Sequence, residues 1–355
     1  MEGAEGFVWI TERNYGWYIA VYLFFGGLAA GTYLTGVAAE LLRGRSTDRT
    51  VRGSMRSLGQ WGLLLSLFSI GAGMAFLLVF HLGAPLRSLL FPVLFVNTGS
   101  WLVIGTWVIV LFTAVVAAQI LWLLWGGRPI GTSAFPRVAT GRIERRYGVP
   151  IDSWLTRLAT ASDPGRAGRL LLHGVGAVLA VVTAAYTGLK LGYVAGVVPL
   201  WNETYLPALF LASALSIGLA AAVGSAVLFD GLEGLRATAF SVADDVVLVV
   251  ELLIVILLVS TLAAGGPGAA ASYERLTGEF GAVFWGIVVA AGLIAPLVIS
   301  AAILLIERRT DVHEDERLRR FVRGGYVAKF GLVVIGGIAL RYLVIAVAIH
   351  APINV

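Results

Sequence analysis

The 355-residue sequence contains no cysteine and only four histidines. Without cysteine the protein can form no disulfide, no thiolate metal site and no iron–sulfur cluster of its own. A haem held by two histidines needs both on facing helices at one depth, and only His81 and His350 are predicted to share a level. We therefore expect no haem, no iron–sulfur cluster and no protein-bound metal in this protein.

Charge is also scarce, at 13% of residues, while 58% are hydrophobic. Soluble domains carry about 25% charged residues, so this protein has too little polar surface to fold in water. Within a bilayer the backbone must satisfy its own hydrogen bonds, which leaves helices or a closed barrel. The apolar runs do not alternate and reach the roughly 20 residues that a spanning helix needs. The sequence therefore predicts an all-α polytopic membrane protein.

Eight apolar runs are long enough to span a membrane. They lie at residues 17–42, 58–81, 98–125, 170–193, 206–229, 242–264, 281–306 and 325–350. We divide the sequence into 1–125 (spans one to three), a basic linker at 126–169 and 170–355 (spans four to eight). The simplest architecture is two four-helix bundles, and the sequence leaves the boundary between them open by one span.

Most of the 26 Lys and Arg residues lie in alternate loops on one side. The loops at 43–57, 126–169 and 307–324 are rich in arginine, and Arg236 follows span five. Basic loops stay in the cytoplasm, so we predict that both termini lie outside and that the protein sits in the cytoplasmic membrane. Asp230 and Glu233 are expected in a solvated loop on the basic side.

The first span, "GWYIAVYLFFGGLAAGTYLTG" (16–36), is rich in small residues. Gly27 and Gly31 share a face, as do Gly26 and Ala30, and such faces let another helix approach closely. Tyr22 lies near the outer end of the span. It belongs either to an interfacial aromatic belt or to the lining of a polar cavity.

Several stretches resemble the NrfD/PsrC family, the quinone-interacting membrane subunits of polysulfide reductase and related molybdoenzyme complexes. The stretches are "YLFFGGLAAGTYL" in span one, "HLGAPLR" at 81–87, "NTGSWLVIGTW" at 97–107, "AYTGLKLGYVAGVVPLWNETYLPALFLASALSIGLA" at 185–220 and "LRYLV" at 340–344. They occur in the family's order over nearly the whole sequence. His81 departs from the pattern, because the family often has an acid there.

The resemblance implies a pocket near the outer face that binds menaquinone or ubiquinone, with the family's pocket tyrosine at Tyr186 and its first-helix polar position near Tyr22. It also implies an outer ferredoxin-like subunit with four iron–sulfur clusters and a molybdopterin catalytic subunit as partners. The protein itself would then be a membrane subunit rather than the terminal catalytic subunit.

Polar groups within membrane spans are costly and mark functional candidates. Quinone chemistry moves electrons with protons, so it needs hydrogen-bond donors and titratable groups. On the outer side we assign catalytic roles to His81, Tyr186 and Arg341, and quinone contacts to Tyr22, His81, Tyr186, Lys190, Asn202 and Arg87. Arg341 lies too deep to reach water, so it should pair with an acid or line a cavity. Lys190 could instead extend its amine to the interface.

Toward the basic side, Asp244 and Glu251 are seven residues apart and share one helix face. With Lys329 they form either a proton path or a structural charge pair. Two rival functions remain. A secondary transporter or channel would show broken helices in corresponding halves, where Pro296 interrupts only span seven. A purely structural anchor would leave the outer polar groups dispersed.

Overall fold

The computed structural model describes residues 17–76, 97, 99–127, 129, 131–193, 196–231, 235–309 and 315–348. Most residues in these ranges are helical, and none of them belongs to a strand. The long helices are α1 (Trp17–Arg45), α2 (Arg49–Phe76), α5 (Trp101–Leu124), α8 (Gly165–Gly192), α9 (Tyr205–Asp230), α10 (Leu235–Ala263), α12 (Ala295–Arg309) and α13 (Glu316–Ala346). The short elements are η2 (Thr132–Ala134), α6 (Phe135–Tyr147), α7 (Ile151–Ala161), α11 (Pro267–Glu274), η3 (Arg275–Glu279) and η4 (Ala282–Ile294).

Eight helical segments among these residues are long and apolar enough to cross a membrane, which makes this a multi-pass membrane protein. They coincide with the eight predicted spans. Several helices extend past the apolar run at the arginine-bearing end: α2 begins at Arg49 and α13 at Glu316. The reason is that intrahelical hydrogen bonding continues where water, rather than lipid, surrounds the side chains.

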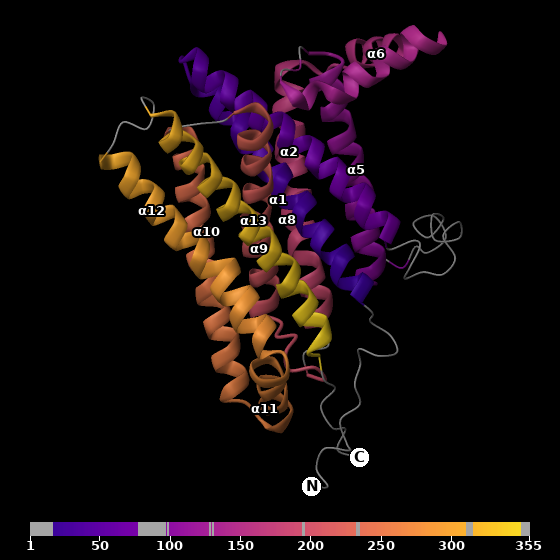
Figure 1. The fold of residues 1–355 in the computed structure, drawn as a ribbon. Helices are drawn as coiled ribbons and strands as arrows, with labels where there is room; N and C mark the ends of the chain where they lie inside the picture. Colours follow the sequence, from indigo (N-terminus) through magenta and orange to yellow (C-terminus); the bar gives the residue numbers. More distant parts are fainter. Residues whose placement is uncertain are drawn as a thin grey trace.

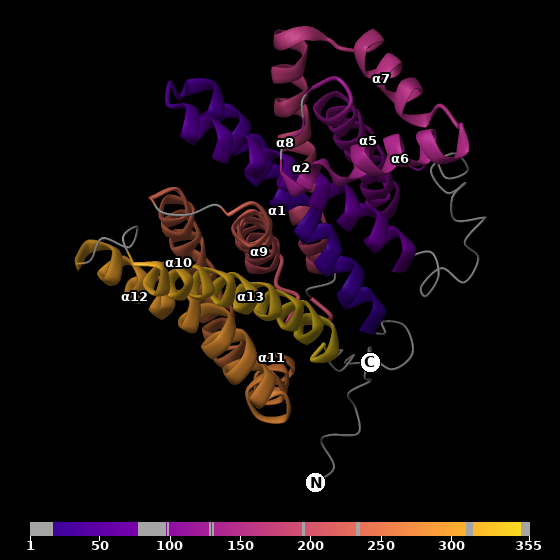
Figure 2. The same cartoon turned by 45° about the horizontal axis from the view of Figure 1, so that its top comes forward.

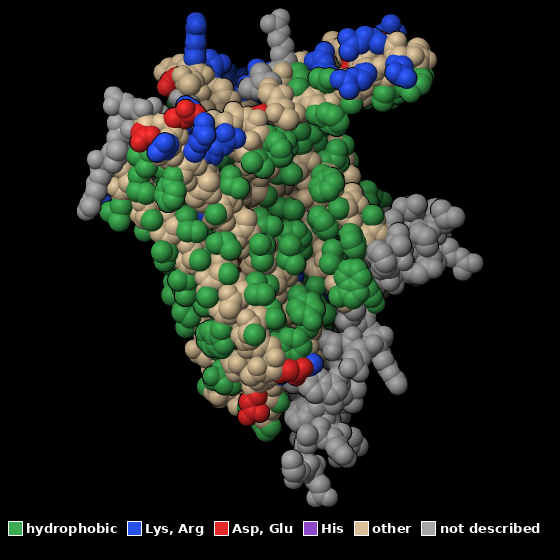
Figure 3. Space-filling model, viewed as in Figure 1, with side chains coloured by type: hydrophobic (Ala, Val, Ile, Leu, Met, Phe, Trp, Pro, Cys, Tyr) green, Lys and Arg blue, Asp and Glu red, His purple; other side chains and the backbone are tan. Residues whose placement is uncertain are grey.

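Lys and Arg side chains gather at one end of the molecule, around α6 and the neighbouring helix ends (Figure 3). The α1–α2 hairpin, the start of α8 and the end of α12 all meet this basic end (Figure 1). The flank between the two ends is mostly apolar (Figure 3). This distribution agrees with the alternation of basic loops in the sequence, whereas the assignment of that end to the cytoplasm stays a prediction.

The predicted linker at 126–169 contains the helices α6 and α7. Two indole hydrogen bonds fasten α7 and its C-terminal turn to α5: Trp125 Nε1 donates to Asp152 at 2.9 Å, and Trp122 Nε1 donates to Ser162 at 2.9 Å. The segment therefore packs as a structured cap on the basic end.

Helix α9 lies in the middle of the assembly and packs against α1, α2, α8, α10 and α13 (Figure 2). Its closest crossing is with α1, where a Cβ on Gly31 or Gly218 would overlap the backbone of the other helix. The predicted small-residue face of Gly27 and Gly31 is therefore a real contact face. Gly26, in contrast, has open space beside it.

Two buried hydrophobic clusters surround this crossing. One joins α1, α2, α5 and α8 through residues such as Tyr33, Phe112 and Leu124. The other joins α1 and α9 to α10, η4, α12 and α13. Because α1 contributes to both clusters, the helices pack continuously, and the division into two four-helix bundles stays a prediction.

The seventh span changes its winding partway. Residues Ala282–Ile294 form a π-helix and the α-helix α12 follows from Ala295. Pro296 has no N–H to donate to the preceding turn, so the regular α-helical ladder is interrupted there. Gly292 lies in the π-helix and meets Gly336 of α13 at a close backbone approach.

Asp230 ends α9 and is held by three donors. Ser57 Oγ donates at 2.6 Å, Trp61 Nε1 at 2.8 Å and the backbone N–H of Thr132 at 2.8 Å. The expectation of a freely solvated loop carboxylate is wrong, because Asp230 connects α2 and η2 to α9. Glu233 lies outside the described residues.

Candidate functional site

Lys329 of α13 is fully buried and faces two neighbouring carboxylates of α10. Its Nζ lies 2.6 Å from Asp245 Oδ1 and 3.4 Å from Asp244 Oδ2. It also donates to Ser241, at 2.6 Å to the hydroxyl and 2.9 Å to the carbonyl oxygen. The ammonium thus has polar atoms for all three of its protons, as burial of a charge requires.

Polar contacts continue from Lys329 toward the basic end. Ser300 of α12 hydrogen-bonds both Asp245 and Ser241. Nearer the end of the helices, Thr238 donates to Glu307 at 2.7 Å and lies 2.9 Å from the Tyr326 hydroxyl. Helices α10, α12 and α13 each contribute to these contacts, which run from the half-buried Glu307 inward.

Helix α9 supplies two buried serines to the carboxylates of α10. Ser216 donates to Asp244 Oδ1 at 2.9 Å. One turn deeper, Ser213 hydrogen-bonds the buried Glu251. Because residues three apart lie on the same side of a helix, both hydroxyls lie on the side of α9 that faces α10. Ser216 contacts Asp244 there, and Ser213 contacts Glu251.

Arg341 of α13 is 1% exposed and lies on the other side of Ser213. Its Nη1 donates to Ser213 Oγ at 2.9 Å and to the carbonyl oxygen of Gly337 at 3.0 Å. The hydroxyl of Ser213 can accept from Arg341 while it donates to Glu251. Among the described residues Arg341 forms no direct ion pair with an acid, and Ser213 links it to Glu251. The expectation that it pairs with an acid or lines a cavity stays a prediction.

The room for this guanidinium comes from the absence of a side chain on α1. A Cβ on Gly27 would lie 2.6 Å from Arg341 Nη2. The ring of Phe210 on α9 covers the opposite side, with Arg341 Cζ 5.4 Å from its centroid. Arg341 Nε is buried and has no hydrogen-bond partner among the described residues, so a water or another acceptor is needed there.

These contacts form a polar file through the second half of the protein, defined here by Lys329, Asp244, Asp245, Glu251 and Arg341 with the bridging serines. Twelve residues of α13 separate Lys329 from Arg341, or about 18 Å at 1.5 Å per residue. The file holds two cations and three carboxyl groups. Since net charge is costly in an apolar interior, the file approaches neutrality when one carboxyl group holds a proton. Whether these groups carry protons or only balance charge stays a prediction.

Tyr186 and Lys190, two of the predicted quinone contacts, are four residues apart on α8 and share a face. Tyr186 is buried against Gly105 of α5, where a Cβ would overlap its ring. Lys190 is partly buried in the last turn. The predicted contact of these side chains with a quinone stays a prediction.

The other predicted outer residues have separate positions. Tyr22 of α1 is partly buried. Asn202 has a structural contact, because its Oδ1 accepts from the backbone N–H groups of Thr204 and Tyr205 at 2.9 and 3.0 Å, at the start of α9. His81 and Arg87 lie outside the described residues. Arg341 belongs to the polar file.

Sequence reasoning identified Asp244, Glu251 and Lys329 but missed the serines that connect them. Ser213 and Ser216 lie in the stretch "LASALSIG", where their spacing of three was the available signal. Tyr326 and Glu307 were missed because each lies near a helix end, where polar side chains are ordinary. Among the described residues, no group of three or more His, Asp or Glu side chains is arranged to hold a metal ion.

Two comparisons relate the sequence to known proteins. The family model for "Polysulphide reductase, NrfD" matches residues 10–351. The sequence is also 27% identical over 345 residues to the C subunit of polysulfide reductase from Wolinella succinogenes, with 93% of this protein and 92% of that subunit covered. The family match therefore includes all eight candidate spans and the whole polar file.

Proposed function

Since the chain belongs to the polysulphide reductase NrfD family, we propose that it is the quinone-binding membrane subunit of an oxidoreductase complex. In this role it exchanges electrons and protons between the quinone pool and an iron–sulfur partner on the outer side of the cytoplasmic membrane. The observation that carries the proposal is the polar file on α9, α10 and α13. Buried charges in membrane helices are costly and are typical of proton and substrate pathways.

The quinone site of this proposal lies toward the ends of the helices opposite the basic end. Tyr186 and Lys190 of α8 supply donors for a quinone oxygen, and Tyr22, His81, Arg87 and Asn202 are the further residues that we assign to it. A hydroxyl or an ammonium group can hold a carbonyl oxygen, and a histidine can exchange the proton that accompanies reduction. Menaquinone and ubiquinone both satisfy this chemistry.

Electrons must reach that site from outside the protein, because it contains no cysteine to hold a cluster. The relative of matching length is named as one component of polysulfide reductase, which supports a place within a multisubunit redox complex. We propose a ferredoxin-like subunit with four iron–sulfur clusters as the direct partner. A molybdopterin subunit would then carry the terminal reaction.

Protons would move along the polar file between the basic end and the depth of Glu251. Asp244, Asp245 and Glu251 are the carriers in this scheme. Lys329 and Arg341 offset their charge, and the serines give hydrogen-bonded connections. A water between Ser216 and Ser213 would complete the path.

The quinone assignment is tested with Tyr186→Phe in the purified complex. The ring keeps its packing against Gly105 while the hydroxyl is lost, so the complex should assemble normally. Quinone-coupled turnover should fall by about tenfold, the loss of one good hydrogen bond at roughly 1.4 kcal/mol. Tyr193→Phe is the matched control, because Tyr193 is 78% exposed at the end of the same helix. Unchanged turnover in Tyr186→Phe would remove this residue from the site.

The proton assignment is tested with Glu251→Gln in proteoliposomes that contain the complex and a pH-sensitive dye. The amide can keep its bond to Ser213 but cannot carry a proton, so proton uptake or pumping per electron should fall. Glu274→Gln on α11, which is exposed, should behave as wild type. An unaltered proton stoichiometry in Glu251→Gln would make the file a structural element.

The rival transporter function needs broken helices in corresponding halves. Span seven has its π-helical segment before Pro296, whereas the described parts of spans one to four are continuous α-helices. A purely structural anchor gives no reason to bury four charged groups, which are Asp244, Glu251, Lys329 and Arg341. Binding of a labelled quinone analogue to the complex separates these functions, since neither rival predicts saturable binding lost in Tyr186→Phe.

A further inference from the structure

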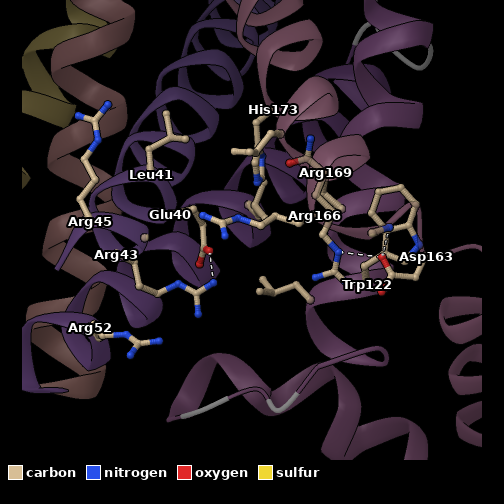
Figure 4. A pocket seen from close by; sticks show the side chains of 16 residues that line it. Glu40, Leu41, Arg43, Arg45, Arg52, Trp122, Asp163, Arg166, Arg169 and His173 are labelled. Carbon is tan, nitrogen blue, oxygen red and sulfur yellow. Dashed lines mark hydrogen bonds and ion pairs between the residues drawn. The ribbon is translucent and has the colours of Figure 1, made fainter. Parts of the chain in front are cut away.

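A separate cavity of about 720 Å³ opens at the basic end, between α1, α2, α5 and α8 (Figure 4). It lies in the first half of the protein, whereas the polar file runs through the second. Its lining includes five arginines and two carboxylates: Arg43, Arg45, Arg52, Arg166, Arg169, Glu40 and Asp163. The cavity therefore has a clear excess of positive charge.

Two of these arginines are already neutralised within the protein. Arg43 lies 2.7 Å from Glu40, and Arg169 lies 2.8 Å from Asp163. The hydrogen bonds from Arg169 and the Gly165 N–H lower the pKa of Asp163, which keeps this pair charged. Arg45, Arg52 and Arg166 have no ion-pair partner within the part of the sequence that the structure describes. These three side chains are exposed, and they give the cavity its net positive charge.

Within the part of the sequence that the structure describes, four buried polar atoms in the cavity lining have no hydrogen-bond partner: Arg43 Nε, Glu40 Oε1, Gln119 Oε1 and His173 Nδ1. An unsatisfied buried group costs about 1–3 kcal/mol, and four around one cavity indicate that a polar molecule occupies it. The set offers the N–H of Arg43 to an acceptor and the oxygens of Glu40 and Gln119 to donors.

The orientation of Gln119 is fixed by its own contacts. Its Nε2 donates to Tyr33 Oη at 2.8 Å and to the carbonyl oxygen of Leu172 at 3.2 Å. Since a carbonyl can only accept, the nitrogen must face Leu172, and the oxygen then faces the cavity. The occupant must therefore present hydroxyl donors as well as anionic oxygens.

The mouth of the cavity has an apolar side. Leu41 of α1 and Leu170 of α8 both line it and are 44% and 47% exposed. Arginine recognises phosphate oxygens with charge-assisted hydrogen bonds, and basic pockets between membrane helices accept anionic lipid head groups. A zwitterionic head group would bring its ammonium toward unpaired arginines.

We propose that this cavity binds the phosphodiester head group of an anionic glycerophospholipid, such as phosphatidylglycerol or cardiolipin. Arg43, Arg52 and Arg166 hold the phosphate, and Glu40 and Gln119 accept hydrogen bonds from glycerol hydroxyls. The acyl tails leave past Leu41 and Leu170. Bound in this way, the lipid fastens the α1–α2 hairpin to α5 and α8.

The test uses the full-length protein, purified with its partner subunits, delipidated in detergent and titrated with single lipids under native mass spectrometry. Wild type should retain one phosphatidylglycerol or cardiolipin with at least tenfold higher affinity than phosphatidylethanolamine. Arg52→Gln/Arg166→Gln breaks no ion pair among the residues that the structure describes and should lose that preference. Arg142→Gln/Arg157→Gln removes the same charge from exposed positions on α6 and α7 and should keep it.

Three results would overturn the proposal. Equal affinity for phosphatidylethanolamine would exclude recognition of anionic head groups. An equal loss in Arg142→Gln/Arg157→Gln would reduce the effect to general surface charge. Displacement of the lipid by millimolar inorganic phosphate, with the same gain in thermal stability, would assign the cavity to free phosphate. Wild type alone decides the first and third results, so the test stands even where the double variant does not assemble.

Discussion

Replacing Lys329 by methionine tests whether the polar file is held together by charge. Methionine has a similar length and no charge, so the contact with the Phe330 ring is largely retained. The substitution removes the 2.6 Å and 3.4 Å approaches to Asp245 and Asp244 together with two bonds to Ser241. The two carboxyl groups then lie in an apolar interior without their cation.

Breaking a buried ion pair from one side costs about 3–5 kcal/mol, whereas exposed pairs contribute about 0–1 kcal/mol. The side chains of Lys329 and Asp244 are 0% exposed and that of Asp245 is 20% exposed. The buried value therefore applies, and Lys329→Met should lower the free energy of unfolding by about 3–5 kcal/mol.

The assay is reversible unfolding in mixed micelles with increasing SDS, followed by intrinsic tryptophan fluorescence. A double-mutant cycle with Asp245→Asn supplies the control. Asparagine has nearly the same volume as aspartate and removes one of the two negative charges that Lys329→Met leaves without a cation. The double variant should be more stable than Lys329→Met alone, with a coupling energy of about 1–3 kcal/mol. A loss below about 1 kcal/mol, or additive effects in the cycle, would refute the reasoning.

Other predictions concern helix packing and the cap at the basic end. Gly218→Ala should destabilise the protein by about 1–3 kcal/mol in the same assay, because its Cβ would overlap the backbone at Gly31. Gly26→Ala should be neutral or stabilising, because Gly26 has open space beside it. Equal effects of the two substitutions would contradict the assigned crossing of α1 and α9. Asp230→Asn should cost about 1–3 kcal/mol and increase proteolysis near residue 132, because an amide cannot accept all three donors; a wild-type cleavage pattern would disprove this. Trp201→Phe loses the 2.8 Å bond to Val344 O and should lower the thermal midpoint by a few degrees, measured by light-scattering melts, and an unchanged midpoint would count against it.

The number and place of the membrane spans could be predicted because every helix that crosses the lipid core must be apolar over its whole width. An apolar run of about 20 residues is sufficient evidence for a span, and all eight runs form helices. The helix ends could not be predicted as well. Residues 49–57 are polar and lay outside the predicted second span, yet α2 begins at Arg49, because water-facing turns extend a helix at little cost.

Helix pairing was only partly readable from the sequence. Gly27 and Gly31 were correctly predicted to face other helices, but sequence could not tell which partner each would meet. Gly31 meets the backbone of α9, whereas Gly27 leaves space for the guanidinium of Arg341. Both positions require a residue without a side chain. The presence of glycine therefore does not show whether its neighbour is a helix backbone or a large side chain.

Charged residues within spans were recognisable one at a time, since each is rare at that depth. Their partners were not, because the partners lie on other helices far along the sequence. Lys329 and Asp245 are 84 residues apart, and Arg341 and Ser213 are 128 apart. Asn202 is the opposite case. The sequence suggested a ligand-binding side chain, whereas in the structure this side chain accepts hydrogen bonds from two backbone N–H groups at the start of a helix.

The central place of α9 has a consequence for biogenesis. Spans one to four leave the ribosome before residue 205. At that stage α9, which packs against Gly31 of α1, has not yet been inserted, so Gly31 is surrounded by lipids or by the insertion machinery. The first four spans should therefore stay loosely associated and open to proteolysis until the fifth is inserted. A comparison of nascent polypeptides whose fifth span is still inside the ribosome with longer ones whose fifth span has entered the membrane would reveal that step as a sharp gain in protease resistance.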